Sequence, residues 1–219
     1  MAHAAASDYI PLFPLPSIVF FPRTFLPIHV FEPRYREMVS DCMAGERVIG
    51  MVLLREGWEA GYRGNPPIYG VGCLGRMVDV RKLEDGRFNV LLRGLERFTI
   101  REERFDRSYR QARVEAHMVD QDPVATLPDR LTRELMDATR SYFERSRQME
   151  TFQEILDLDL DRVTLLHTLS MGLDLTVIEK QFLLEAGTLE SQGKRLLELL
   201  HFRSLEQRAG GSGPRHLGH

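Results

Sequence analysis

The chain has few cysteines, few lysines and no long uninterrupted apolar segment. Two cysteines, Cys42 and Cys73, are too few to cross-link 219 residues, and they are expected to be buried free thiols in a helix and a strand. No run approaches the roughly 18 apolar residues of a membrane helix. Residues 1–8 lack the basic and apolar regions of a secretory signal. These absences favour a cytoplasmic protein without a membrane span.

The sequence also lacks the basic surplus that nucleic-acid-binding proteins carry. Residues 8–118 contain 17 Lys and Arg against 15 Asp and Glu, and residues 124–205 contain 10 against 14. A protein that neutralises many phosphates needs a stronger positive charge. The charge pattern therefore predicts no nucleic-acid partner.

Motifs for catalysis, metals and cofactors are missing too. The chain has no phosphate-binding Gly-x-x-x-x-Gly-Lys-Ser/Thr loop, no Gly-x-Ser-x-Gly elbow, and no His-x-x-x-His or Cys-x-x-Cys pair. The letters Gly-x-Gly-x-x-Gly occur at residues 70–75, but a strand pattern follows where a dinucleotide site needs a helix. Asp157, Asp159 and Asp161 suit a helix start better than a calcium loop. We expect no catalytic residue, no metal site and no cofactor.

The most informative segment is residues 11–38, where prolines interrupt very apolar runs. Each proline fixes its own φ, removes a backbone donor and favours extended geometry in the residue before it. A helix cannot run through residues 11–27, so short extended segments with tight corners are expected. Pro33 suits a first helical turn and Gly45 suits a helix end, which together predict a helix over residues 34–44.

Strand signals fill the rest of the N-terminal half. Apolar or alternating runs occupy residues 47–54, 68–83, 88–92, 97–101 and 109–118. The pair Asp85-Gly86 predicts a hairpin, and Arg93-Gly94 predicts a further turn. Six or more short strands with one early helix indicate a small, strongly bent sheet or barrel.

After an acidic linker at residues 120–123, the apolar period becomes helical. Thr126 with Asp129 is a plausible helix cap, and the helix is expected to reach about Arg147. Its apolar face consists of Leu127, Leu131, Leu135, Ala138 and Tyr142.

Further helical stretches follow at residues 155–158 and 161–171. Thr176 and Glu179 form a capping box, and a last helix is expected from Thr188 to about Phe202. The sequence thus predicts an α+β protein with three parts. They are a β-rich domain over residues 8–119, a helical subdomain over 124–205 and a disordered tail over 206–219.

Several ordered strings carry a resemblance to a known family. They begin with Pro-Leu-Phe-Pro-Leu at 11–15 and Leu-Pro-Ile-His-Val-Phe-Glu-Pro-Arg-Tyr at 26–35, and they continue at 50–54, 69–75, 85–94 and 173–186. Over about residues 9–203 the chain resembles the Lon N-terminal domain, the substrate-binding domain ahead of the ATPase in Lon proteases. The resemblance implies a PUA-like pseudo-β-barrel followed by a helical bundle.

The resemblance also implies a function. The 219 residues contain neither the ATPase nor the Ser–Lys protease region, so we expect a stand-alone, non-catalytic module that binds unfolded or apolar polypeptide segments. A protease or chaperone is an expected partner, and a homodimer is left open. RNA binding, by analogy with PUA-like folds alone, is the alternative.

Apolar side chains supply the candidate binding surface. The segment with Phe21, Phe25, Leu26 and Phe31 has more apolar bulk than a small barrel needs, and its prolines stiffen a groove that an extended peptide can enter. Core packing is the alternative for each phenylalanine. For His29, in the same segment, the alternative is a rim or packed histidine that is hydrogen-bonded to the backbone. Aromatic residues in the loop-like stretch 55–67 are expected at the surface. The candidate peptide-binding residues are Phe21, Phe25, Leu26, His29, Phe31, Trp58 and Tyr62.

Overall fold

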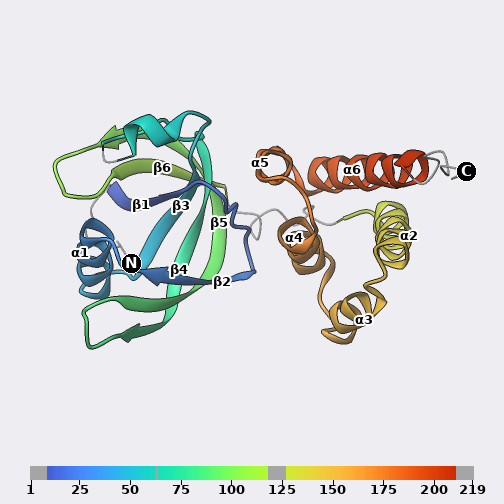
Figure 1. The fold of residues 1–219 in the computed structure, drawn as a ribbon, viewed down its shortest axis with the longest axis horizontal. Coiled ribbons are helices and arrows are strands. Elements are labelled where there is room, and N and C mark those ends of the chain that lie inside the picture. The colour runs from blue at the N-terminus through green and yellow to red at the C-terminus, as the bar shows by residue number, and fades with distance from the viewer. Residues whose placement is uncertain (1–8, 63, 118–126, 211–219) are drawn as a thin grey trace, which may run out of the picture. The chain divides into compact units, whose positions relative to one another are not determined.

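The computed structural model describes residues 9–62, 64–117 and 127–210, and it describes side chains up to residue 205. Strands fill the first part and helices the second (Figure 1). The strands are β1 (Tyr9–Leu15), β2 (Phe25–Val30), β3 (Val48–Leu53), β4 (Val71–Lys82), β5 (Phe88–Arg104) and β6 (Gln111–His117). The helices are α1 (Pro33–Met43), the short 3-10 helix η1 (Trp58–Gly61), α2 (Asp129–Ser146), α3 (Met149–Asp157), α4 (Arg162–Gly172), α5 (Val177–Leu184) and α6 (Leu189–Gly210).

The described residues form two compact units. The β-rich unit joins all the strands, α1 and η1 to residues 167–185, and the helical unit joins residues 127–166 to α6. The predicted α+β class is confirmed. The expected domain boundaries, at 8–119 and 124–205, stay a prediction, and the linker at 120–123 lies outside the described residues.

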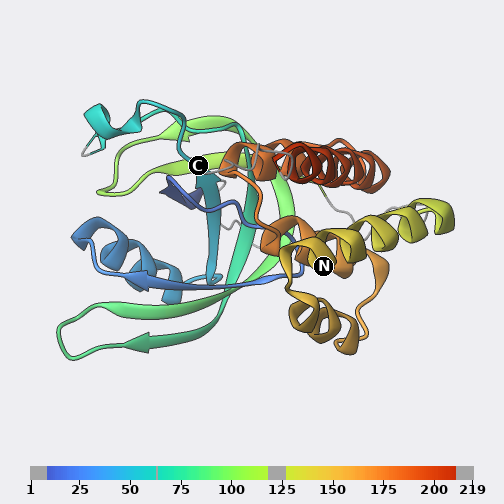
Figure 2. The ribbon, with the colours of Figure 1, turned by 45° about the vertical axis from the view of Figure 1, so that its right-hand side comes forward.

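Of the strands that the structure describes in the β-rich unit, five pair in a ring, β5-β4-β3-β1-β6, and β2 pairs with β5 alone. The sheet order is β2-β5-β4-β3-β1-β6, and β5 also pairs with β6. The β1–β3 pair is parallel and the other pairs are antiparallel. The 17-residue strand β5 makes this possible, because its first half pairs with β2 and its second half with β6. Figures 1 and 2 both show the strands curving, with α1 beside them.

The hairpin prediction at Asp85-Gly86 is confirmed, whereas the turn predicted at Arg93-Gly94 is wrong. Gly86 has a φ of +79° in the turn between β4 and β5. Strand β5 continues through Gly94 without a turn. A Cβ atom at Gly94 would lie 2.1 Å from the carbonyl oxygen of Phe21, so the glycine allows a close backbone approach within a strand.

Residues 71–75 lie in a strand, as predicted, and not in a cofactor loop. Strand β4 begins at Val71, and its register with β5 shifts between Cys73 and Gly75. A Cβ atom at Gly72 would lie 2.4 Å from the carbonyl oxygen of Met51. Glycine is therefore required for close packing of strands.

Helix α1 begins with Pro33 at its first turn, as predicted, and turns one face to the core. Its buried residues join side chains of the sheet in one apolar cluster. Both cysteines are buried free thiols, as expected. Burial raises the pKa of the Cys42 thiol to about 12 and also raises that of Cys73. The α1 residues in this cluster are Tyr35, Met38, Val39 and Cys42.

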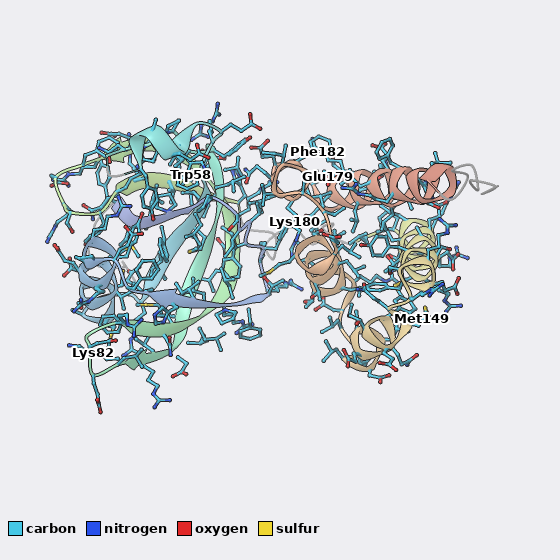
Figure 3. All side chains as sticks on the ribbon, viewed as in Figure 1. Trp58, Lys82, Met149, Glu179, Lys180 and Phe182 are labelled. Carbon is cyan, nitrogen blue, oxygen red and sulfur yellow. The ribbon has the colours of Figure 1, made fainter. Side chains whose placement is uncertain are left out.

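Helix α5 belongs to the β-rich unit. The capping box is present: Thr176 Oγ1 accepts a hydrogen bond from the Glu179 amide (3.2 Å), and the Glu179 carboxylate accepts one from the Thr176 amide (2.7 Å). Figure 3 labels Glu179 on this helix. The buried Gln181 side chain donates to the carbonyl of Val71 (3.1 Å), which fastens α5 to β4.

Helix packing organises the other unit. The amphipathic face of α2 is buried through Leu131, Leu135 and Tyr142, as its period predicts. Asp161 Oδ1 accepts hydrogen bonds from the amides of Val163 (3.0 Å) and Thr164 (3.1 Å), so it caps the start of α4.

The ends of the helical segment differ from expectation. The backbone of α6 stays helical to Gly210, beyond the expected end near Phe202. The cap predicted at Thr126 and the last part of the expected tail lie outside the described residues. No helix in the described part of the chain combines the length and hydropathy that a membrane crossing requires.

Candidate peptide-binding surface

Strand β2 places apolar side chains on both of its faces. Its burial alternates strictly: Phe25 is 55% exposed, Leu26 only 6%, and the pattern continues to Val30. Phe31, directly after the strand, is 60% exposed. Four exposed residues therefore follow one another at every second position, and we name them the β2 row: Phe25, Pro27, His29 and Phe31.

Two of the residues expected to bind peptide belong to the interior instead. Phe21 has no exposed surface and Leu26 points into the core, so neither offers surface to a ligand. Phe21 is held by a hydrogen bond from Thr24 Oγ1 to its carbonyl (2.7 Å) and by the close approach of Gly94. The burial of these two residues depends on the local backbone and on what packs against it, which the composition of the segment does not reveal.

His29 has a defined place within the β2 row. Its Nδ1 donates a hydrogen bond to Asn89 Oδ1 (2.7 Å), and its Nε2 accepts one from Arg87 Nη1 (3.3 Å), so the proton is on Nδ1. Its ring stacks on Phe31 with the centroids 6.2 Å apart. Arg87 also pairs with Asp85, and their hydrogen bond lowers the pKa of the Asp85 carboxyl. The row therefore contains a hydrogen-bonded imidazole between apolar side chains.

Strand β2 is also an edge of the sheet. Among the described strands it pairs with β5 alone. The Gly94 amide donates to the carbonyl of Thr24 (2.8 Å), so by alternation the even-numbered residues direct their backbone groups at β5. Phe25, Pro27 and His29 direct theirs away from it. Pro27 fits there because it has no N–H to donate.

Trp58 and Tyr62 form a second aromatic pair after Gly57, whose φ of +81° begins η1. Their rings meet edge to face with the centroids 5.3 Å apart, and both are half-buried against the core. Figure 3 shows Trp58 on this part of the β-rich unit. The Tyr62 hydroxyl donates to the Glu32 carboxylate. Burial and this bond raise the pKa of Tyr62.

Glu32 thus connects the two groups of candidate residues, because it follows Phe31 in the chain and accepts from Tyr62. It also pairs with Arg34 (3.0 Å). The Arg34 guanidinium contacts two aromatic rings, with its carbon 4.6 Å from the centroid of Tyr35 and 5.0 Å from that of Tyr62.

A cavity that no sequence pattern predicts adjoins Tyr62 of this second pair. It has a volume of about 220 Å³, and Tyr62 and Arg34 belong to its lining. Five of its lining residues come from the segment between β5 and β6, and two of these, Tyr109 and Arg110, are buried. No motif marks the cavity, since its walls are up to 96 positions apart in the chain, from Pro14 to Arg110. In the described part of the chain, no cluster of three or more His, Cys, Asp or Glu side chains could hold a metal ion.

The comparisons with known proteins agree with this architecture. The family model of the ATP-dependent protease La (LON) substrate-binding domain matches residues 9–201, and the chain therefore belongs to this family. The predicted resemblance to the Lon N-terminal domain is confirmed.

Whole Lon proteases are among the curated relatives. Lon protease of Anaeromyxobacter dehalogenans is 28% identical over 197 residues, and Lon protease 2 of Myxococcus xanthus is 26% identical over 193. Each alignment covers 88% of this chain but 23% of the relative. The chain thus spans about a quarter of the length of the proteases that it matches.

Solved structures share the fold. The N-terminal domain of Mycobacterium avium complex Lon protease superposes with a TM-score of 0.66 at 18% identity, covering 88% of this chain and 98% of that one. The Lon N-terminal domain protein from Xanthomonas campestris gives a TM-score of 0.62 at 23% identity, covering 89% and 98%.

Proposed function

We propose that the chain binds non-native polypeptide segments through the β2 row and the free edge of β2, and that it catalyses no reaction itself. The family to which it belongs is named for substrate binding, which supports the binding step. The ATP hydrolysis and peptide cleavage of whole Lon proteases are not part of the proposal. A cytoplasmic setting, with a protease or chaperone receiving the bound segment, completes it.

The observation that carries the proposal is the exposure of Phe25 in an edge strand and of Phe31 directly after it. Exposed aromatic side chains in a row are costly in water and mark binding surfaces. The strand is held rigid by its pairing with β5, by Pro27 and by the hydrogen bonds of His29. A ligand that lies on the row therefore meets a surface that needs little ordering.

The free edge specifies the form of the ligand. An extended peptide could accept hydrogen bonds from the amides of Phe25 and His29 and donate to the outward carbonyls of the strand. Such backbone pairing is independent of the peptide's sequence, which suits a binder of varied unfolded segments. Because Pro27 offers no donor, the edge pairs incompletely, and this limits uncontrolled sheet growth.

The expected affinity is modest. Covering the exposed half of one phenylalanine removes about 100 Å² of apolar surface from water, which is worth at most about 2.5 kcal/mol. Two such side chains supply at most about 5 kcal/mol, so hydrogen bonds along the edge must offset the cost of ordering the peptide and add the rest of the roughly 5.5–8 kcal/mol that a dissociation constant of about 1–100 μM requires. Rapid, reversible binding follows.

Titration with fluorescent unfolded peptides tests the proposal. Phe25→Ser and Phe31→Ser should each weaken binding about tenfold, whereas Val78→Ser, which removes an apolar side chain that is 47% exposed on β4, should not. A peptide that is N-methylated at alternate amides should bind more weakly than its parent, because it cannot pair along the edge. RNA oligonucleotides titrated in parallel test the alternative function.

The proposal fails if no peptide binds below about 100 μM, or if Val78→Ser weakens binding as much as the two phenylalanine variants do. Salt-dependent binding of RNA in place of peptide would favour the alternative.

A further inference from the structure

The cavity beside Tyr62 contains a buried cation with unused hydrogen-bonding capacity. Arg110 is 7% exposed; its Nη2 donates to the carbonyl of Pro66 (2.8 Å), and its Nε pairs with Glu103 (3.3 Å). Its Nη1 has no hydrogen-bond partner among the described residues. Burial lowers the pKa of this guanidinium, as desolvation does for a cation. A buried donor of this kind is costly to leave unpaired, so it is a candidate ligand contact.

The lining of the cavity carries charge of one sign. Besides Arg110 it includes Arg34 and Arg107, and none of its described lining residues is acidic. Each arginine has a carboxylate partner outside the lining: Glu32 for Arg34, Asp41 for Arg107 at 3.6 Å, and Glu103 for Arg110. These partners hold the guanidinium groups in place but leave donors over. Arg34 also donates from Nη1 to the carbonyl of Tyr62 (3.3 Å), so Arg110 Nη1 is the buried cavity nitrogen that has no partner among the described residues.

Aromatic rings form the other walls of the cavity. The Phe105 ring centroid lies 5.4 Å from the Arg110 guanidinium carbon, and the rings of Tyr35, Tyr62 and Tyr109 also belong to the lining. The Tyr109 hydroxyl is already committed to Asp41 (2.7 Å). Rings beside guanidinium groups lower the local dielectric and strengthen a charge-assisted hydrogen bond.

We propose that this cavity binds a carboxylate of the polypeptide ligand, either its C-terminal carboxylate or an Asp or Glu side chain. The inference rests on the proposed function, because it names a feature of the same ligand. A carboxylate matches the fork of a guanidinium in geometry and charge, and a cavity of about 220 Å³ admits such a small group. Tyr62 lines the cavity and also bonds to Glu32, which directly follows Phe31 of the β2 row in the chain.

The test uses the full chain and matched peptides. In the first pair, one aromatic-rich peptide is made with a free C-terminal carboxylate and with a C-terminal amide. In the second pair, both peptides have an amidated end, and one has an internal Glu where the other has Gln. The carboxylate form should bind about tenfold more tightly than its neutral match. The pair that shows the difference identifies the source of the carboxylate.

Arginine variants then locate the effect. Arg110→Gln should abolish the preference for the carboxylate peptide over its neutral match. Arg107→Gln should reduce this preference severalfold without changing the affinity for the amide peptide. Arg107 is 56% exposed, so the second variant does not depend on a buried substitution. The control is Arg113→Gln, which removes an ion-paired arginine that is 55% exposed on β6, outside the cavity, and should leave the preference unchanged.

Two outcomes overturn the inference while the proposed function stands. They are equal binding of the acid and amide forms, and an Arg113→Gln effect as large as that of Arg107→Gln, which would indicate diffuse charge attraction. If no peptide binds, the proposed function fails and a small probe decides the inference alone. N-acetylphenylalanine, but not its amide, should shift the Arg110 Nε–H resonance in a nitrogen NMR titration; no shift would overturn the inference.

Discussion

Phe21 and Phe25 are four residues apart, and the structure leaves no surface of the first exposed but 55% of the second. The carbonyl of Phe21 faces Gly94 at a distance that excludes any side chain there, and its ring lies 6.2 Å from that of His167. Phe25 begins β2 on the outer face. One phenylalanine therefore supports the fold, and the other is available to a ligand.

Alanine substitutions should separate these two roles. Phe21→Ala should lower the free energy of unfolding by about 3–5 kcal/mol, since it leaves a large cavity in the core. Phe25→Ala should change it by less than about 1 kcal/mol. Urea unfolding followed by circular dichroism measures both. Equal destabilisation by the two variants would contradict the assignment of Phe25 to the surface.

Some turns and helix caps could be predicted from the sequence, because each depends on a few residues that are close together in the chain. The hairpin at Asp85-Gly86 needs only a residue that tolerates positive φ, and the capping box of Thr176 and Glu179 needs only a four-residue segment. Pro33 at the start of α1 is a similar case. Each could be predicted because its partners are close in the chain.

Features that depend on distant partners could not be predicted in this way. Gly94 looks like a turn residue until Phe21 is known to lie against it. In β2 both faces are apolar, so the period of two does not reveal which phenylalanine is outside. The burial of Arg110 and its contacts with Pro66 and Glu103 appear only in the folded chain, because Pro66 is 44 positions away. The proposed binding surface could therefore be located only with the structure.

Gly70 and Gly72 should respond differently to the same substitution. An added Cβ at Gly72 would lie 2.4 Å from the Met51 carbonyl oxygen and 2.6 Å from the Phe98 ring, whereas nothing lies within 4 Å of one at Gly70. Gly72→Ala should destabilise the protein by about 1–3 kcal/mol or more. Gly70→Ala, the control, should be close to neutral. Thermal unfolding of the two variants checks this, and similar melting temperatures would refute it.

The two cysteines should be inert in the folded protein. Cys73 is fully buried and Cys42 nearly so, and burial raises both thiol pKa values, that of Cys42 to about 12. Few thiolates are then present at pH 8, and reagents cannot reach them. Iodoacetamide should modify neither residue in native buffer and both in urea, as counted by mass spectrometry. Rapid modification of native protein would show that the interior around α1 opens.

His117 should make the stability of the protein depend on pH in one direction. It is hydrogen-bonded to Thr99 Oγ1 (2.7 Å), and burial, followed by the charge of Arg97, lowers its pKa. The unfolded chain, with an ordinary histidine pKa near 6.5, therefore binds more protons than the folded chain in the window below that value. The stabilisation from neutral His117 is complete above the unfolded pKa and is lost as the pH falls towards the lower folded pKa.

Urea unfolding at pH 7.5 and pH 5.5 measures this loss. The free energy of unfolding should fall between the two values in the wild-type protein, and it should fall less in His117→Gln, which keeps a hydrogen-bonding side chain but does not titrate. The other histidines and the carboxylates are common to both proteins, so the difference between the two slopes isolates His117. A steeper fall in the variant than in the wild type would mean that the folded state prefers the charged imidazole, the reverse of the expected sign.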